Sequence, residues 1–138
     1  MPPLPPQLVE PRTEHDWSKS IWKFLTDSDM WVATGRERQL WDRTRVDVLT
    51  DKLALEIDWA KKWTEAVGQA CWYATNTSKQ AGIILLVKDK TVDNKYVYRC
   101  LTVATKLQFV LWIVETTTRQ LIVDSETYTL PQIEKRNA

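Results

Sequence analysis

Three carboxylates lie close together in the middle of the sequence, where the pattern predicts two adjacent strands. Asp47 lies in the first of these segments, and Glu56 and Asp58 lie two residues apart in the second. Side chains two residues apart on a strand leave the same face, so Glu56 and Asp58 point the same way. Clustered carboxylates repel one another unless a cation binds to them, and a hard divalent ion prefers oxygen ligands. The spacing therefore indicates a metal site.

The segment that follows these acids predicts an amphipathic helix. Lys62, Glu65 and Gln69 are spaced as neighbours on its polar side. Lys62 rather than Lys61 is expected to face the carboxylates, because Lys62 shares this polar side with Gln69. The sequence thus predicts that a lysine and an amide converge on the acids.

The same residues have a purely structural interpretation. Asp47 by itself is typical of a solvated acid near a turn, and Lys62 is as typical of a solvated helix as of a catalytic site. Glu56 and Asp58 are harder to explain in this way. The rest of their strand is largely Leu, Ala and Ile, and buried acids are rare without a partner.

The remaining reactive residue types give no second catalytic constellation. His15 is the only histidine and is expected at the surface, where no triad can be built around it. Cys71 and Cys100 show neither CxxC spacing nor the partners of a nucleophile. Cys71 falls within a helical pattern, so a reduced, buried thiol is expected there.

Tryptophan is unusually frequent, with eight residues in the chain. Most of them are expected in the core. Trp41 and Trp72 are the candidates for stacking on nucleic-acid bases or for packing a contact between two copies of the chain.

The elements that must position these residues alternate between helices and strands. Thr13 is a suitable N-cap for the first helix, and an isolated Gly68 in the second helix suggests close approach to the sheet. Strands alternating with helices indicate an α/β fold with a mixed sheet. The predicted elements are a helix over 13–26, strands over 31–40, 43–50 and 53–59, a helix over 60–75, a buried strand over 81–87, a helix over 94–107, a buried strand over 109–114, and an edge strand or packed tail over 120–129.

The length of 138 residues fits one domain. A Pro-rich extended arm is expected over residues 1–12, the domain over 13–130 and a tail over 131–138. The formal net charge of +1 gives no global signal for nucleic acid, although a local basic rim would suffice. No leader is present and no apolar run approaches the roughly 18 residues of a membrane span, so we expect a cytoplasmic protein with no membrane partner.

The order of these elements resembles the PD-(D/E)XK nuclease superfamily, with an acid on its second strand and E-x-acid on its third. The resemblance covers residues 13–115. Residues 56–69, EIDWAKKWTEAVGQ, are also similar to a string E-[VFI]-D-[FW]-A-x-K-W-x-E-A-[IV]-G-Q that recurs in small uncharacterised bacterial and phage members. The resemblance implies a single-domain α/β fold with an αβββαβ restriction-endonuclease-like core, in which helices flank a mixed central sheet.

The resemblance also implies roles for individual residues. Asp47 and Glu56 would bind the metal, and Glu14 matches the acid of the first helix, with Glu37 as a second candidate. Asp58 departs from the superfamily pattern, which has lysine at that position. Lys62, four residues further on, could supply the missing cation because lysine has a long flexible stem, and Asp58 could then be a third ligand.

The implied activity is hydrolysis of DNA phosphodiesters with Mg²⁺ or Mn²⁺. Lys62 would neutralise charge on the phosphorane, Gln69 would hydrogen-bond a phosphate or the attacking water, and Arg43 and Arg45 would grip the DNA backbone. Two other interpretations stay open. One is a nucleic-acid-binding domain of the same fold that has lost turnover, and the other is a protein-interaction module with the PPLPP segment as a second contact. To grip a duplex, so small a domain would need to form a homodimer or join a larger complex.

Overall fold

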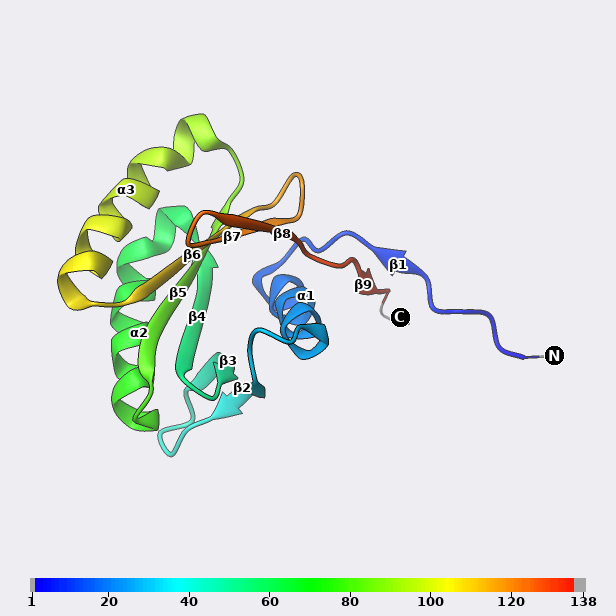
Figure 1. Cartoon of the computed structure of the whole chain (residues 1–138), viewed down its shortest axis with the longest axis horizontal. Helices are drawn as coiled ribbons and strands as arrows, with labels where there is room; N and C mark the ends of the chain where they lie inside the picture. Colours follow the sequence, from blue (N-terminus) through cyan, green and yellow to red (C-terminus); the bar gives the residue numbers. More distant parts are fainter. Residues whose placement is uncertain (1, 136–138) are drawn as a thin grey trace.

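The computed structural model describes residues 2–135, which form one α/β domain around a mixed sheet (Figure 1). Met1 of the expected arm and residues 136–138 of the expected tail lie outside the described residues. The helices are α1 (Glu14–Asp27), α2 (Trp63–Thr77) and α3 (Lys90–Leu107), with a 3-10 turn at Ala60–Lys62. The strands are β1 (Leu8–Val9), β2 (Ala33–Gln39), β3 (Arg45–Thr50), β4 (Leu53–Trp59), β5 (Gln80–Val87), β6 (Val110–Glu115), β7 (Gln120–Val123), β8 (Glu126–Thr129) and β9 (Ile133–Glu134).

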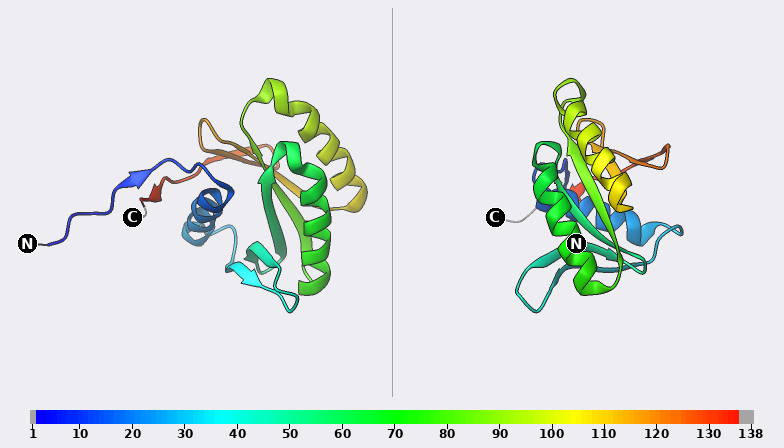
Figure 2. Two further views of the ribbon diagram at one scale, coloured as in Figure 1. Left: turned by 180° about the vertical axis from the view of Figure 1, so that it is seen from behind. Right: turned by 90° about the vertical axis from the view of Figure 1, so that its left-hand side faces the viewer.

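The main sheet has seven strands in the order β2-β3-β4-β5-β6-β7-β8. Strands β4, β5 and β6 are parallel, and the strands on either side of them pair antiparallel. Helices α2 and α3 connect the parallel strands and cover one face, while α1 covers the other (Figures 1 and 2). The mixed sheet with helices on both faces confirms the predicted α/β class with a mixed sheet.

The alternation within β4 divides the interior into two layers. Leu55 and Ile57 pack with Trp17 and Ile21 of α1, on one face of the sheet. Ala54 packs on the other face, against Tyr73 of α2. The prediction that Glu56 and Asp58 share the face of Ala54 follows from the same alternation.

Helix α1 begins where the sequence predicts. The Thr13 hydroxyl accepts a hydrogen bond from the Asp16 N–H at 3.1 Å, and the Asp16 carboxylate accepts from the Thr13 N–H at 3.3 Å. This capping box satisfies two backbone donors that the first turn would otherwise leave unpaired. It also fixes Glu14, the next residue, at the start of the helix.

The expectation for Gly68 is wrong. It is exposed, and a Cβ built on it meets no atom within 4 Å, so no close approach requires glycine there. Gly82 of β5 is the glycine at a close approach, since a Cβ there would lie 2.5 Å from Cδ2 of Leu55.

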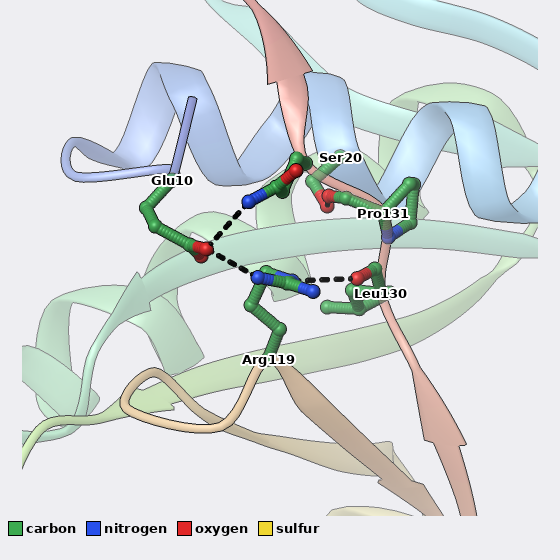
Figure 3. Close-up of polar contacts among 6 residues, drawn as sticks. Glu10, Ser20, Arg119, Leu130 and Pro131 are labelled. Atoms are coloured by element: carbon green, nitrogen blue, oxygen red, sulfur yellow. Dashed lines mark hydrogen bonds and ion pairs between the residues drawn. The ribbon is translucent and has the colours of Figure 1, made fainter. Parts of the chain in front are cut away.

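The N-terminal arm is not simply extended away from the domain. Its β1 pairs antiparallel with β9, and Arg119 joins the two segments (Figure 3). The Arg119 guanidinium contacts the Glu10 carboxylate and donates through Nε to the Leu130 carbonyl at 3.0 Å. Glu10 also accepts from Gln132 at 2.8 Å. Residues 7–10 and residues 130–135 therefore lie side by side, while the chain before them extends away from the domain (Figure 1).

Four further expectations need correction. The helix expected from residue 94 begins at Lys90, because Asp89 caps it by accepting from the Thr91 N–H at 3.0 Å. Residues 120–129 form the hairpin of β7 and β8 rather than one strand or a tail, and β6 is only partly buried. Cys71 is exposed, whereas Cys100 is buried. Among the described residues, no helix combines the length and the apolar character needed to cross a bilayer.

Candidate active site

Strands β3 and β4 separate at Asp47, which creates the candidate site. Their register pairs Val48 with Leu55 and Leu49 with Ala54. Beyond these pairs the Asp47 side chain takes the place of a backbone acceptor, and its Oδ2 accepts from the Ile57 N–H at 2.7 Å. The carboxylate is thus fixed in the fork between the strands.

The acids of β4 lie at this fork and are almost completely buried. Glu56 is 4% exposed and Asp58 is 5% exposed. Glu56 Oε2 is buried without a hydrogen-bond partner, which is costly for a carboxyl oxygen. A buried oxygen without a partner, in a side chain beside Asp47, is a position that a ligand would satisfy.

Asp47 and Glu56 lie close enough to shift each other's pKa. Burial and then the charge of Asp47 raise the pKa of Glu56 to about 10. Burial also raises the pKa of Asp47, to about 6, although the Ile57 N–H opposes this by stabilising the ionised form. In the metal-free protein at neutral pH, the proton of the pair therefore resides on Glu56.

Asp58 forms a second pair with the acid of the first helix. Burial, followed by a side-chain hydrogen bond with Glu14 and the Glu14 charge, raises the pKa of Asp58 to about 7. The Trp59 N–H donates to Asp58 Oδ1 at 2.8 Å, and the positive charge of Lys62 also favours the ionised form. Glu14, Asp58 and Lys62 therefore lie within electrostatic reach of one another.

The two lysines at the start of α2 face different surroundings. Lys62 is exposed and acts on Asp58, as described above. Lys61 instead lines a separate pocket of about 320 Å³ with Trp59, Lys88 and Asp93. Gln69 lies exposed two turns further along α2. Lys62 is thus the lysine whose charge reaches Asp58, whereas Lys61 lines the separate pocket.

Glu37, the second candidate for the acid ahead of Asp47, contacts two other side chains. His15 Nδ1 lies 2.5 Å from Glu37 Oε1, and Arg36 Nη1 lies 3.6 Å from the same oxygen. The His15 side chain is thus half-buried against Glu37 rather than simply at the surface. Glu37 still contributes to raising the pKa of Asp47, so it lies near the fork.

Arg43 and Arg45 lie on the hairpin that joins β2 and β3. Both are exposed, and Arg43 has a φ of 72°, in the left-handed region, at the tip. Arg45 is two residues from Asp47 on β3. The arginines therefore border the fork without entering it.

The carboxylates at the fork offer few oxygens to a divalent ion. Within residues 2–135, no three Asp, Glu, His or Cys side chains are grouped so that they could hold a metal ion. The pair Asp47 and Glu56 nevertheless fits Mg²⁺, which is commonly bound through one or two carboxylates and keeps several waters. The free oxygen of Glu56 supplies the unsatisfied ligand atom.

Sequence reasoning did not identify Tyr73 as part of the site. This residue of α2 is buried over the acids, and burial followed by the charges of Glu56 and Asp47 raises its pKa. Its position in the apolar stripe of α2 indicated core packing and gave no sign of the acids beneath it. The pairing of His15 with Glu37 was also missed, because the two residues are 22 positions apart in the sequence.

Comparison with known proteins adds no relative: no family model, curated protein or solved structure matches this chain.

Proposed function

We propose that the protein is a small nuclease that hydrolyses DNA phosphodiesters with Mg²⁺ or Mn²⁺. The observation that carries the proposal is the pair of Asp47, which is partly buried, and Glu56, which is buried, at the fork of β3 and β4, with one carboxyl oxygen of Glu56 left without a partner. A buried pair of acids destabilises a fold, so its presence requires a compensating role. Binding a cation is the role that fits the charge and the atom type.

The arrangement of the elements supports a restriction-endonuclease-like core. A helix, three antiparallel strands, a second helix and a parallel strand follow one another from α1 to β5. Asp47 lies on the second of these strands and Glu56 on the third. This is the placement of acids that the resemblance to the PD-(D/E)XK superfamily leads one to expect.

Each side chain would have a definite task. Asp47 and Glu56 would hold the ion, which supplies an activated water and neutralises charge on the phosphate when bound. Lys62 would contribute a positive charge beside the scissile phosphate. Asp58, paired with Glu14, would hold a proton close to the reacting groups, and Gln69 would hydrogen-bond the substrate.

The substitution at the usual lysine position does not remove the cation from the site. Asp58 stands there, but the charge of Lys62 reaches Asp58 from the first turn after β4. A lysine side chain is long enough to act from a neighbouring turn, because its ammonium group lies at the end of four methylenes. The charge needed at the phosphate is therefore retained.

The proposal is tested by incubating plasmid, linear, single-stranded and branched DNA with the protein in Mg²⁺, Mn²⁺ or EDTA. Cleavage is expected with either metal and not in EDTA, and Glu56→Gln should lower it by at least a hundredfold. Glu126→Gln changes an exposed carboxylate of β8, at the opposite edge of the sheet from β2, and should cleave like the wild type. DNA binding with no cleavage under any condition would instead identify a domain that has lost turnover.

A further inference from the structure

The tip of the β2–β3 hairpin carries the most exposed tryptophan of the described chain. Trp41 is 78% exposed, and Trp72 of α2, beside it, is 40% exposed. The two rings meet edge to face, with centroids 6.1 Å apart and planes inclined by 61°. A large aromatic surface thus stands open to solvent at the C-terminal end of α2.

Hydrogen bonds hold this aromatic surface in place. The Trp41 indole N–H donates to Asn76 Oδ1 at 2.7 Å, and the Trp72 indole N–H donates to Asp42 Oδ2 at 2.9 Å. Asp42 is itself fixed, since its Oδ1 accepts from the Thr44 hydroxyl at 2.6 Å. Both indole N–H groups are already hydrogen-bonded, so the exposed ring faces can bind a partner only by stacking. A ring that is already oriented also loses little conformational entropy when it binds a partner.

The charge around the rings favours an anionic partner. Arg38, Arg43 and Arg45 are exposed along the same hairpin, and Asp42 is the only acid between them. Arginines beside open aromatic rings match the two parts of a single-stranded nucleic acid, whose phosphates are negative and whose unpaired bases expose flat faces. Bases within a duplex are already stacked on one another and would not present those faces.

We propose that the hairpin tip binds single-stranded nucleic acid, with Trp41 stacked on an unpaired base and Arg43 and Arg45 on the neighbouring phosphates. This binding site stands on its own geometry, and only its relation to cleavage rests on the proposed nuclease function. It specifies the substrate as a strand with unpaired bases, such as a single strand or the open part of a branched molecule.

One polar stripe of α2 connects this tip to the carboxylates. Its residues follow one another at helical spacing. Trp72 and Asn76 at one end contact the hairpin tip, and the charge of Lys62 at the other end acts on Asp58. The members of the stripe are Lys62, Glu65, Gln69, Trp72 and Asn76. Trp72 is ten positions after Lys62, or about 15 Å along the helix at 1.5 Å per residue. A strand stacked at 3.4 Å per nucleotide would therefore place about four or five nucleotides between the stacked base and the acids.

The test measures binding of a labelled twelve-nucleotide single strand and of the matching duplex by fluorescence anisotropy in EDTA, so that cleavage does not interfere. Trp41→Ala should weaken single-strand binding by about tenfold or more, since stacking on an aromatic residue contributes strongly per base. Duplex binding should change little. Tyr98→Ala is the matched control, because Tyr98 is 71% exposed but lies on α3.

Circular dichroism and sedimentation of each variant complete the test. Equal single-strand binding by wild type and Trp41→Ala overturns the proposal, and so does tighter binding of the duplex than of the single strand. A change in oligomeric state with unchanged DNA binding would show that a second copy of the chain covers the rings, which also overturns it. Loss of single-strand binding in Trp41→Ala supports the site even if the wild type cleaves no DNA, so the two proposals fail separately.

Discussion

Replacing Glu56 with glutamine removes the carboxyl group whose pKa lies furthest from its ordinary value among the described residues. Burial, and then the Asp47 charge, raise the pKa of Glu56 from 4.5 to about 10. The folded, metal-free protein therefore keeps Glu56 protonated at neutral pH, whereas the unfolded chain ionises it. Glutamine has nearly the same shape, can donate an N–H toward Asp47, and carries no charge at any pH.

The expected effect follows from proton linkage. Because the pKa is raised in the folded state, the favourable contribution of protonated Glu56 is fully present below pH 4.5 and is lost as the pH rises toward about 10. At pH 7 the unfolded chain has gained about 3 kcal/mol from ionising Glu56, at about 1.4 kcal/mol per pH unit. Glu56→Gln should therefore be more stable than the wild type by about 3 kcal/mol at pH 7, and by close to nothing at pH 4.5. A difference of that size corresponds to roughly 10 °C in Tm.

Urea unfolding followed by tryptophan fluorescence in EDTA, at half-unit steps from pH 4.5 to pH 8, measures this difference. Glu126→Gln, which changes an exposed carboxylate of β8, serves as the control and should show no difference of that size. Added Mg²⁺ at pH 8 should stabilise the wild type and leave Glu56→Gln unchanged, because a ligand stabilises only the state that binds it. Stability curves for wild type and Glu56→Gln that run parallel with pH would refute the reasoning, since Glu56 would then titrate alike in both states.

Two further predictions concern α2 and the sheet. Lys62→Ala should lower turnover by at least tenfold with little change in stability. Lys61→Ala, which alters a separate pocket, should leave turnover near the wild-type value. Equal kcat in Lys62→Ala and wild type would place the cationic role elsewhere. Gly68→Ala should raise stability by up to about 1 kcal/mol, because alanine favours an exposed helix position that has free space. Gly82→Ala should lower stability by about 1–3 kcal/mol, since its Cβ would press against the buried Leu55. Urea midpoints that shift in the same direction for the two glycine variants would contradict this.

The fold could be predicted where the signal is local. Thr13 and the charged residues after it marked the start of α1, and the alternation of Leu55 and Ile57 with Glu56 fixed which face of β4 carries the acids. These patterns are set by the helical and strand periods alone, so one sequence suffices to identify them. The helix, strand and turn order around Asp47 followed from the same kind of reasoning.

Other features depend on contacts that the sequence pattern does not encode. An isolated glycine in a helix does not reveal which way it faces, and Gly68 faces solvent. The turn between β7 and β8 uses Asp124 and Ser125 with φ values of 48° and 74°, a conformation usually marked by Asn-Gly, so the hairpin went unrecognised. The divergence of β3 from β4 at Asp47 is likewise a tertiary feature, although it is what brings the acids together.

The pairing of β1 with β9 has a consequence for the order in which the molecule assembles and opens. The contacts that accompany it join Glu10 to Arg119 and to Gln132, which are 109 and 122 positions away in the sequence. Closing so long a loop in an unfolded chain costs about 4 kcal/mol of entropy, more than two short strands return. The two-stranded sheet of β1 and β9 can therefore form only after the main sheet has brought these strands together, and it can detach while the main sheet remains intact. Its amide protons should exchange with solvent well before those of β4 and β5, which makes the arm a locally detachable part of an otherwise cooperative domain.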